Sequence, residues 1–253
     1  MHVAITGASS GIGAALAREL GRAGHALTLV ARRRTLLDGI AAELGERSFV
    51  IEHDLSDPGR ATDWLAPSEA ALGPIYVLVH HSGMENTGPT IEADPATFLR
   101  MIDLNLATPL LLSRAILPAM VARGDGMIVN VASLAALISV PMQAYYGASK
   151  AGLAMFSETL RAELTGTGVH ILTVYPGPVS TAMSDSAAEA FGGRDNLPSV
   201  PEGKPEELAV LIRRAMERRS SRVIYPRVYA VSRWFSPLAR AIVDRFAPRR
   251  PLR

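Results

Sequence analysis

The sequence predicts an α/β protein, with one parallel sheet covered by helices on both faces. Three observations support this fold class. Apolar runs of strand length alternate with stretches of helical character along most of the chain. Turns containing glycine or proline separate many of them. The chain has 253 residues, 48% of them hydrophobic, which is enough for one domain with a substantial core. Such alternation favours right-handed crossovers, with ligands bound at the carboxyl ends of the strands.

The first strand, helix and strand form a βαβ unit around a glycine-rich turn. Residues 3–6 are an apolar strand, an amphipathic helix follows the turn, and residues 26–30 are a second strand. Gly24 stops the helix between them. Glycines let the backbone approach a pyrophosphate, and the N–H groups and dipole of a helix N-terminus attract it. The predicted nucleotide-binding residues of this turn are Gly7, Ser9, Ser10, Gly11, Ile12 and Gly13.

The remaining elements continue the alternation. We expect further strands at residues 49–52, 75–79, 127–132, 169–174 and 223–225, and helices near 95–122, at 146–163 and from Pro205. The carboxyl ends of parallel strands share one edge of the sheet. The features expected to meet there are the glycine-rich turn, His81, Ser133 and Pro176.

The residues after the second strand predict which dinucleotide binds. A site for NAD has an acidic residue about 20 residues beyond the glycines, which binds the ribose 2′-hydroxyl. Arg32 and Arg33 occupy this place. Guanidinium groups suit a 2′-phosphate, so the sequence predicts NADP(H) in preference to NAD(H). A solvated arginine run without a ligand is the alternative.

Tyr146 and Lys150 are candidate catalytic residues. They lie four apart in a predicted helix, so their side chains share a face while Tyr145 points elsewhere. A phenol has a reference pKa of about 10, and a neighbouring ammonium can lower this pKa by roughly 1 to 3. The pair suits general acid/base catalysis, with Ser133 at a strand end bonding the same substrate oxygen. A solvated Tyr–Lys pair is the common alternative.

Taken together, these motifs resemble the short-chain dehydrogenase/reductase family over residues 1 to about 225. The resemblance rests on Thr6-Gly7-x-x-x-Gly11-Ile12-Gly13, Asp54-Leu55, Asn105, Ser133, Tyr146-x-x-x-Lys150 and Pro176-Gly177-x-Val179-x-Thr181. It implies a single-domain, Rossmann-type, doubly wound parallel sheet. It also implies that Tyr146 donates the proton and that Ser133 holds the substrate oxygen. Lys150 would lower the pKa of the tyrosine and bind the nicotinamide ribose, and Asn105 would position a relay water.

The resemblance implies cofactor contacts beyond the glycine-rich turn. Asp54 would lie at the adenine and Thr181 near the carboxamide. The other implied contacts are Leu55, Ser82, Gly83, Tyr146, Lys150, Pro176, Gly177 and Val179. Asn105 has a structural alternative, as a polar interruption in a packed helix.

One motif departs from the family pattern. The family usually has Asn-Asn-Ala-Gly after the fourth strand, where this chain has His80-His81-Ser82-Gly83. Adjacent strand residues face opposite sides and cannot readily share an ion, so we expect no metal site. We expect one imidazole to replace the hydrogen bonds of the asparagine to neighbouring strands. The change leaves the packing and cofactor fit of this turn open.

Composition limits the remaining possibilities. The chain has no cysteine, which excludes disulfides, a thiol nucleophile and cysteine-ligated metals. The N-terminus enters a strand at once without the pattern of an export signal, so we expect a cytoplasmic protein. The net charge of +2 conceals an asymmetry. Residues 213–253 hold 12 of the 26 basic residues and 2 of the 24 acidic ones.

The C-terminal part of the chain contains a predicted lid and a basic tail. Residues 182–203 are expected to form a mobile lid over the substrate pocket, and the catalytic domain to extend over residues 1–226. Residues 227–253 form a basic, amphipathic extension. This tail could pack on its own domain or a partner subunit, or dock on an anionic membrane surface. Nucleic acid is disfavoured because no binding motif accompanies the charge.

The sequence therefore predicts an NADP(H)-dependent oxidoreductase that interconverts a carbonyl and an alcohol on an apolar small molecule. A nucleotide-binding sensor without turnover and a nucleotide-sugar epimerase-like enzyme are the alternatives. Family resemblance suggests a homodimer or homotetramer through the helices near residues 100–122 and 146–163.

Overall fold

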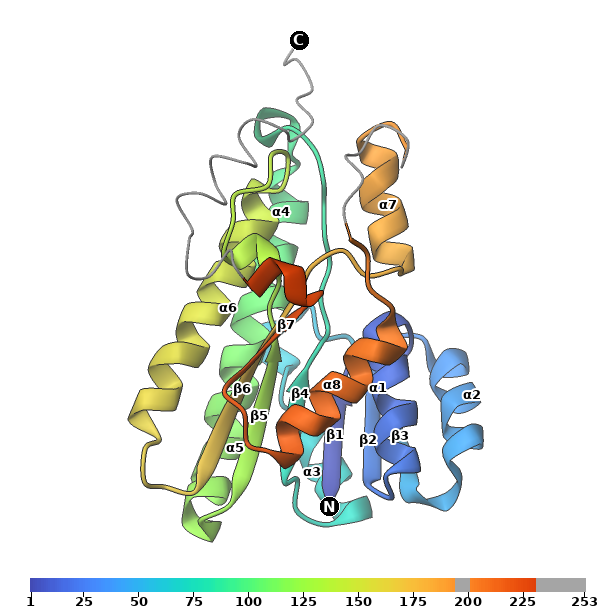
Figure 1. Ribbon diagram of the computed structural model, residues 1–253. Helices are drawn as coiled ribbons and strands as arrows, with labels where there is room; N and C mark the ends of the chain where they lie inside the picture. The colour runs from blue at the N-terminus through green and yellow to red at the C-terminus, as the bar shows by residue number, and fades with distance from the viewer. Residues whose placement is uncertain (194–200, 231–253) are drawn as a thin grey trace.

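The computed structural model describes residues 1–193 and 201–230 of the chain. Its centre is a seven-stranded parallel sheet with the order β3-β2-β1-β4-β5-β6-β7 (Figure 1). The strands are β1 His2–Thr6, β2 Ala26–Ala31, β3 Ser48–Glu52, β4 Val77–His80, β5 Gly126–Val131, β6 Val169–Pro176 and β7 Arg222–Tyr225. The order reverses between β1 and β4, the switch point at which doubly wound sheets bind ligands. The predicted fold class is confirmed.

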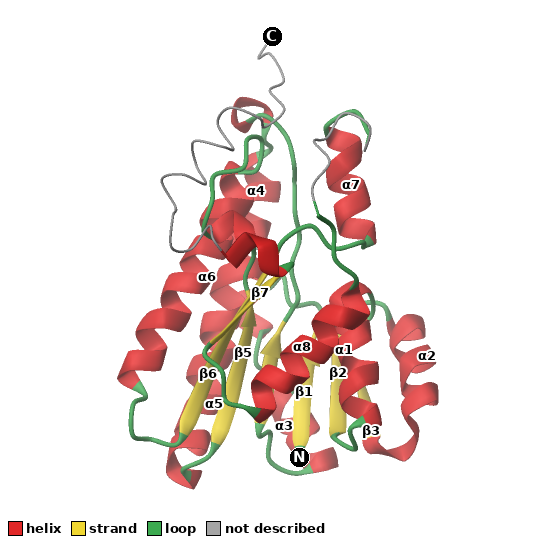
Figure 2. Ribbon diagram, in the orientation of Figure 1, coloured by secondary structure: helices red, strands yellow, loops and turns green. Residues whose placement is uncertain are grey.

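Helices cover both faces of the sheet, as Figure 2 shows. Their bounds are α1 Gly11–Arg22, α2 Arg34–Leu44, α3 Leu65–Leu72, α4 Pro95–Ile102, α5 Thr108–Arg123, α6 Ala144–Glu163, α7 Ala182–Ala190 and α8 Pro205–Glu217. Helices α1, α2 and α8 pack on one face, and α3, α5 and α6 on the other. Each face therefore has its own hydrophobic core.

Strand β1 shows why the two cores form. All five of its residues are buried, so it has no solvent-facing side. Val3 and Ile5 pack against the helices of one face, and Ala4 between them belongs to the core of the other. Alternate side chains of a strand point to opposite faces, so the middle of this central strand is apolar on both sides, while the buried His2 and Thr6 at its ends are hydrogen-bonded.

Two helices reach beyond the carboxyl edge of the sheet. Figure 1 shows α7 and the upper part of α4 above the ends of the strands. Thr181 begins α7 with a capping box, in which its hydroxyl accepts from the Ser184 amide while the Ser184 hydroxyl accepts from the Thr181 amide. The predicted lid at residues 182–203 thus begins as a helix, and its residues 194–200 lie outside the described residues. Most of the basic tail, residues 231–253, also lies outside them.

Most predicted elements are present with small shifts in their bounds. Strand β4 begins at Val77 rather than at Ile75, because the Ile75 amide donates to the Glu69 carboxylate instead of joining the sheet. Helices α2, α3 and α7 were not predicted individually. Helices α3 and α7 have weak apolar spacing and bury only one residue each, whereas α2 is amphipathic and buries Leu37 and Ile40.

Helices α4 and α5 are joined by a π-helical turn, Asp103–Ala107, into one stretch from Pro95 to Arg123. Among the described residues, this is the one helix long and apolar enough to cross a membrane by length and composition. Leu112, Ile116 and Met120 from it pack in the core against the sheet. Single π turns often occur at functional sites, and this one contains Asn105.

Candidate active site

The glycine-rich turn is tight and leaves backbone donors free. Gly7 and Gly11 have φ of +71° and +54°, and a Cβ atom on Gly13 would lie 2.3 Å from the Gly7 carbonyl oxygen. Ser10 gives helix α1 no side-chain cap. In the described part of the chain, nothing accepts a hydrogen bond from the amides of Gly11, Ile12 and Gly13. These unpaired N–H groups at a helix N-terminus fit a pyrophosphate.

Two arginines lie beside this turn. Arg33 donates to the Ser9 hydroxyl at 3.0 Å and to the Ser10 hydroxyl at 2.7 Å, which places its guanidinium over the turn. Arg32 lines a cleft of about 610 Å³ at the carboxyl ends of β2 and β3. Asp54 lines the same cleft. The predicted adenine residue Asp54 and the predicted 2′-phosphate residue Arg32 are therefore neighbours in space, in a cleft that Glu52, His53, Asp57 and Arg60 also line.

Leu55 and the Pro176–Thr181 segment complete the predicted cofactor groove. Leu55 is buried, and its carbonyl oxygen accepts from the Thr108 hydroxyl at 2.8 Å. The Gly177 amide, just after β6, donates to the Tyr225 carbonyl of β7. Val179 is buried. Thr181 lies opposite the glycine-rich turn, because a Cβ atom on Gly11 would come 3.3 Å from its methyl group. The structure thus brings Thr181 next to the glycine-rich turn, although the two are about 170 residues apart in the chain.

Ser133 and Tyr146 are neighbours in the site. Ser133 follows β5, where its hydroxyl accepts from the Ala135 amide at 3.1 Å, and it lies close enough to Tyr146 to lower the pKa of that phenol. Tyr146 lies in the first turn of α6. Tyr145 points away, as predicted, and its ring centroid lies 4.3 Å from that of Phe98 in α4. The geometry therefore distinguishes the two adjacent tyrosines.

The pKa of Tyr146 differs from the prediction. Burial raises the pKa of the phenol, the negative charge of Glu85 raises it further, and the Ser133 hydroxyl opposes both effects only in part. The expectation that Lys150 lowers this pKa is wrong for the protein alone. Desolvation disfavours the phenolate more than its neighbours stabilise it. Tyr146 is therefore protonated at neutral pH.

Lys150 is buried at the same site, with 4% of its surface exposed. Its ammonium group donates to the Val131 carbonyl oxygen of β5 at 2.9 Å. Burial lowers the pKa of Lys150 to about 8, against an opposing effect of the Glu85 carboxylate. A Cβ atom on Gly83 would lie 3.4 Å from the Lys150 nitrogen, so the chain after β4 passes directly by it.

Asn105 fixes the loop that follows β4. Its side-chain oxygen accepts from the Met84 amide at 2.9 Å, and its side-chain nitrogen donates to the Met84 carbonyl at 2.9 Å. The same nitrogen donates to the Ser149 hydroxyl in α6 at 3.1 Å. Asn105 is fully buried and more than a polar interruption in a helix. Its side chain positions Met84 beside α6, and its relay-water role stays a prediction.

The contacts of His80 and His81 differ from the prediction. The His80 Nε2 atom pairs with the Ser113 hydroxyl of α5 at 3.1 Å, so its partner is a helix and not a neighbouring strand. The His81 ring lies against Gly13, whose Cβ atom would be 2.5 Å from it. The backbone amides of His81 and Ser82 both donate to the Thr6 hydroxyl. The expected imidazole bonds to neighbouring strands were therefore wrong, and the threonine hydroxyl ties this turn to β1.

Glu85 is a half-buried acidic residue that was not predicted from the sequence. Its carboxylate accepts from the Thr87 hydroxyl at 2.7 Å and from the Gln143 amide group. Burial raises the pKa of Glu85, against the opposing effects of Thr87 and Lys150. The available signal was an acidic residue two positions after the turn glycine Gly83, where the chain leaves the carboxyl edge of the sheet.

Comparisons with known proteins agree with the fold. A model of the short chain dehydrogenase family matches residues 1–191. A short chain dehydrogenase of Pseudocercospora fijiensis is 36% identical over 71% of this chain and 60% of its own length. Ketoacyl reductase HetN of Nostoc is 35% identical over 70% of this chain and 63% of its own length. The chain thus spans about three fifths of these two curated relatives.

A solved structure extends the likeness to the whole chain. The short-chain dehydrogenase of Sphingobium yanoikuyae, in complex with NADPH, is 29% identical and superposes with a TM-score of 0.81. The superposition covers 100% of this chain and 97% of that one. The chain belongs to the short-chain dehydrogenase family.

Proposed function

We propose that the protein is an NADP(H)-dependent oxidoreductase that interconverts a carbonyl and an alcohol on a largely apolar small molecule. The convergence of Ser133 at the end of β5 with Tyr146 and Lys150 of α6, at the same sheet edge as the glycine-rich turn, carries this proposal. The mainly apolar loop at residues 134–142, between Ser133 and α6, supports an apolar substrate.

The side chains of the site suit the reduction of a carbonyl group. Bound NADPH would supply the hydride to the carbonyl carbon. The oxygen then gains negative charge, which the hydroxyls of Ser133 and Tyr146 can stabilise by hydrogen bonds. Tyr146 holds its proton at neutral pH, so it can transfer that proton to the oxygen. Burial of the site strengthens each of these interactions.

Different residues of the chain would bind the different parts of the cofactor. The free amides of Gly11, Ile12 and Gly13 would bind the pyrophosphate. Arg32 and Arg33 would bind the 2′-phosphate, and this pair is the reason to prefer NADP(H) over NAD(H). At the other end of the groove, Lys150 and Thr181 would hold the nicotinamide ribose and carboxamide. The NADPH bound by the Sphingobium relative supports this assignment.

The adjacent tyrosines provide a matched test. Replacing Tyr146 with Phe removes the proton donor, and general acid catalysis typically contributes about 10²- to 10⁴-fold, so we expect a loss of this size in kcat. Tyr145→Phe should retain the activity, because that ring packs on Phe98. A screen of ketones and secondary alcohols, with NADPH and NADH in parallel, measures both variants by the absorbance of the reduced nicotinamide.

Two results would contradict the proposal. Equal activity of Tyr146→Phe and the wild type would show that another group donates the proton. Tight binding of NADPH, measured by fluorescence titration, without turnover of any carbonyl or alcohol would favour the nucleotide-sensing alternative.

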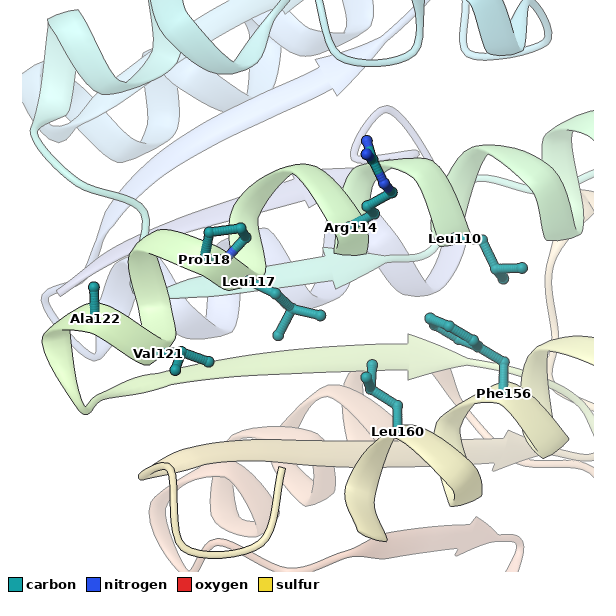
Figure 3. A pocket seen from close by; sticks show the side chains of 8 residues that line it. All are labelled: Leu110, Arg114, Leu117, Pro118, Val121, Ala122, Phe156 and Leu160. Carbon is teal, nitrogen blue, oxygen red and sulfur yellow. The ribbon is translucent and has the colours of Figure 1, made fainter. Parts of the chain in front are cut away.

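We also propose that the chain pairs with a second copy of itself through α5 and α6. Figure 3 shows an apolar groove of about 580 Å³ between these helices, lined by Leu110, Arg114, Leu117, Pro118, Val121, Ala122, Phe156 and Leu160. Met155 and Val121 on the same helices are 66% and 40% exposed. Exposed apolar patches of this kind mark contact surfaces, and an isologous contact would cover the groove on both copies.

A further inference from the structure

Glu85 has no role in the proton transfer proposed above, although it lies beside the residues that perform it. The Asn105 side chain accepts a hydrogen bond from the Met84 amide and donates one to the Met84 carbonyl. These two bonds fix the position of the next residue, Glu85. The charge of Glu85 acts on both Tyr146 and Lys150. Gln143, which directly precedes α6, donates to the Glu85 carboxylate, so this carboxylate lies at the end of α6 that carries Tyr146 and Lys150.

The known contacts of Glu85 account for only one of its two oxygens. The Thr87 hydroxyl and the Gln143 side chain both donate to Oε1. Nothing in the described part of the chain donates to Oε2. The Oε1 contacts tie the loop after β4 to the residue that precedes α6, as does the backbone bond from Gly88 to Met142. A purely structural tie explains Oε1 and leaves the second oxygen unused.

The surroundings of Oε2 select the kind of group that it accepts from. Oε2 is open to solvent and is not one of the buried atoms that lack a partner, so a bound molecule with an N–H or O–H group can take the place of water as its donor. A cationic group would be repelled by the buried Lys150 ammonium, which already acts on this carboxylate. A neutral hydroxyl donates a hydrogen bond without that repulsion.

We propose that Glu85 binds a hydroxyl group on a carbon next to the reacting carbonyl, so that the substrates are α-hydroxy carbonyl compounds and the products vicinal diols. This inference rests on the proposed function. The carbonyl carbon gains the hydride of NADPH and its oxygen gains the Tyr146 proton, while the neighbouring hydroxyl is chemically unchanged. Glu85 is thus a specificity-determining residue on one side of an otherwise apolar pocket.

Two substrate pairs of matched shape test the proposal. Hydroxyacetone and butanone differ by a hydroxyl in place of a methyl group, as do phenacyl alcohol and propiophenone. A hydrogen bond to a charged group contributes enough for Glu85→Ala to lower kcat/KM for the hydroxylated member by about 10- to 100-fold. The change for the other member should stay within about threefold. Glu85→Gln retains an acceptor and should restore part of the selectivity.

Glu92→Ala is the control, because this exposed carboxylate lies on the same loop and should leave the selectivity unchanged. An equal loss on both members of each pair would overturn the proposal and reduce Glu85 to a tie between the loop and α6. Absence of a preference in the wild type would overturn it as well.

A binding measurement separates this proposal from the proposed function. Calorimetry on the full-length protein with NADP⁺ compares a vicinal diol with the matching monohydric alcohol. We expect Glu85→Ala to weaken binding of the diol selectively. If the wild type binds NADP⁺ but turns over no carbonyl, the oxidoreductase proposal fails. The Glu85 proposal then fails only if the diol and the alcohol bind equally well to wild type and variant.

Discussion

Acid should destabilise the protein through His80, and the size of the effect follows from its burial. Desolvation lowers the pKa of His80 to about 3, with a further contribution from Lys150, whereas the unfolded side chain has a pKa of 6.5. Below pH 6.5 the unfolded state therefore binds a proton that the folded state does not. Folding stability is lost progressively as the pH falls from 6.5 toward the folded pKa.

The size of this loss in folding stability depends mainly on the pKa of His80 in the unfolded state. Between about pH 7.5 and about pH 4.5, protonation of the unfolded His80 stabilises that state by about 2.7 kcal/mol. In His80→Gln this contribution disappears, while the glutamine amide can still reach the Ser113 hydroxyl. We expect wild type to lose about 2.7 kcal/mol more than His80→Gln over this range.

Chemical denaturation at the two pH values measures this difference. Titration of the carboxylates is common to both proteins, so it cancels in the comparison. Ser113→Ala is the control, because it removes the hydrogen bond but keeps the buried imidazole, and it should show the pH dependence of the wild type. The same acid sensitivity in His80→Gln and wild type would refute the reasoning.

Three further predictions concern the cofactor, the interface and the tail. Arg32→Asp should weaken NADPH binding by roughly 10- to 100-fold relative to NADH, because it replaces a cation with an anion at the proposed 2′-phosphate site; an unchanged ratio of the two dissociation constants in fluorescence titrations would count against that site. Phe156→Glu puts a charge into the α5–α6 groove and should shift the protein toward monomer in analytical ultracentrifugation. Leu36→Glu on α2 changes an exposed leucine outside the groove and should leave the mass unchanged. An unaltered mass for both variants would exclude this groove as the interface. Full-length protein should float with anionic liposomes and a folded chain ending at Pro226 should not, if the basic tail binds membranes; equal behaviour of the two would assign the tail another role.

The sequence was sufficient where local chemistry and spacing decide the outcome. Strand and helix alternation specified the parallel sheet, because buried parallel strands need apolar runs and crossover helices. The spacing of Tyr146 and Lys150 placed both on one face of α6, and the Phe98 contact of Tyr145 agrees with that phase. The position of Ser133 near the site was also predicted from the sequence, because it follows β5 and the carboxyl ends of parallel strands converge.

Tertiary structure decided the features that depend on burial and on partners distant in sequence. Lys150 was expected to lower the pKa of Tyr146, but desolvation and the nearby Glu85 raise it. His80 was expected to bond neighbouring strands, but the hydroxyl within reach is that of Ser113 on α5. Neither outcome can be predicted from spacing, because the dielectric environment and the donors around a side chain are set by segments far away along the chain.

Glu85 is another residue whose surroundings only the tertiary structure determines. The sequence provided an acidic residue shortly after the turn that follows β4, with no indication of where its carboxylate points. Asn105 and Gln143, 20 and 58 residues further along the chain, hold that loop and the carboxylate beside α6. The sequence by itself determined the fold and predicted the candidate catalytic pair and the glycine-rich turn, since these follow from local periodicity and motif spacing. Only the folded chain determined which charges share a buried space, and therefore which protons the site holds and which substrate groups it can bind.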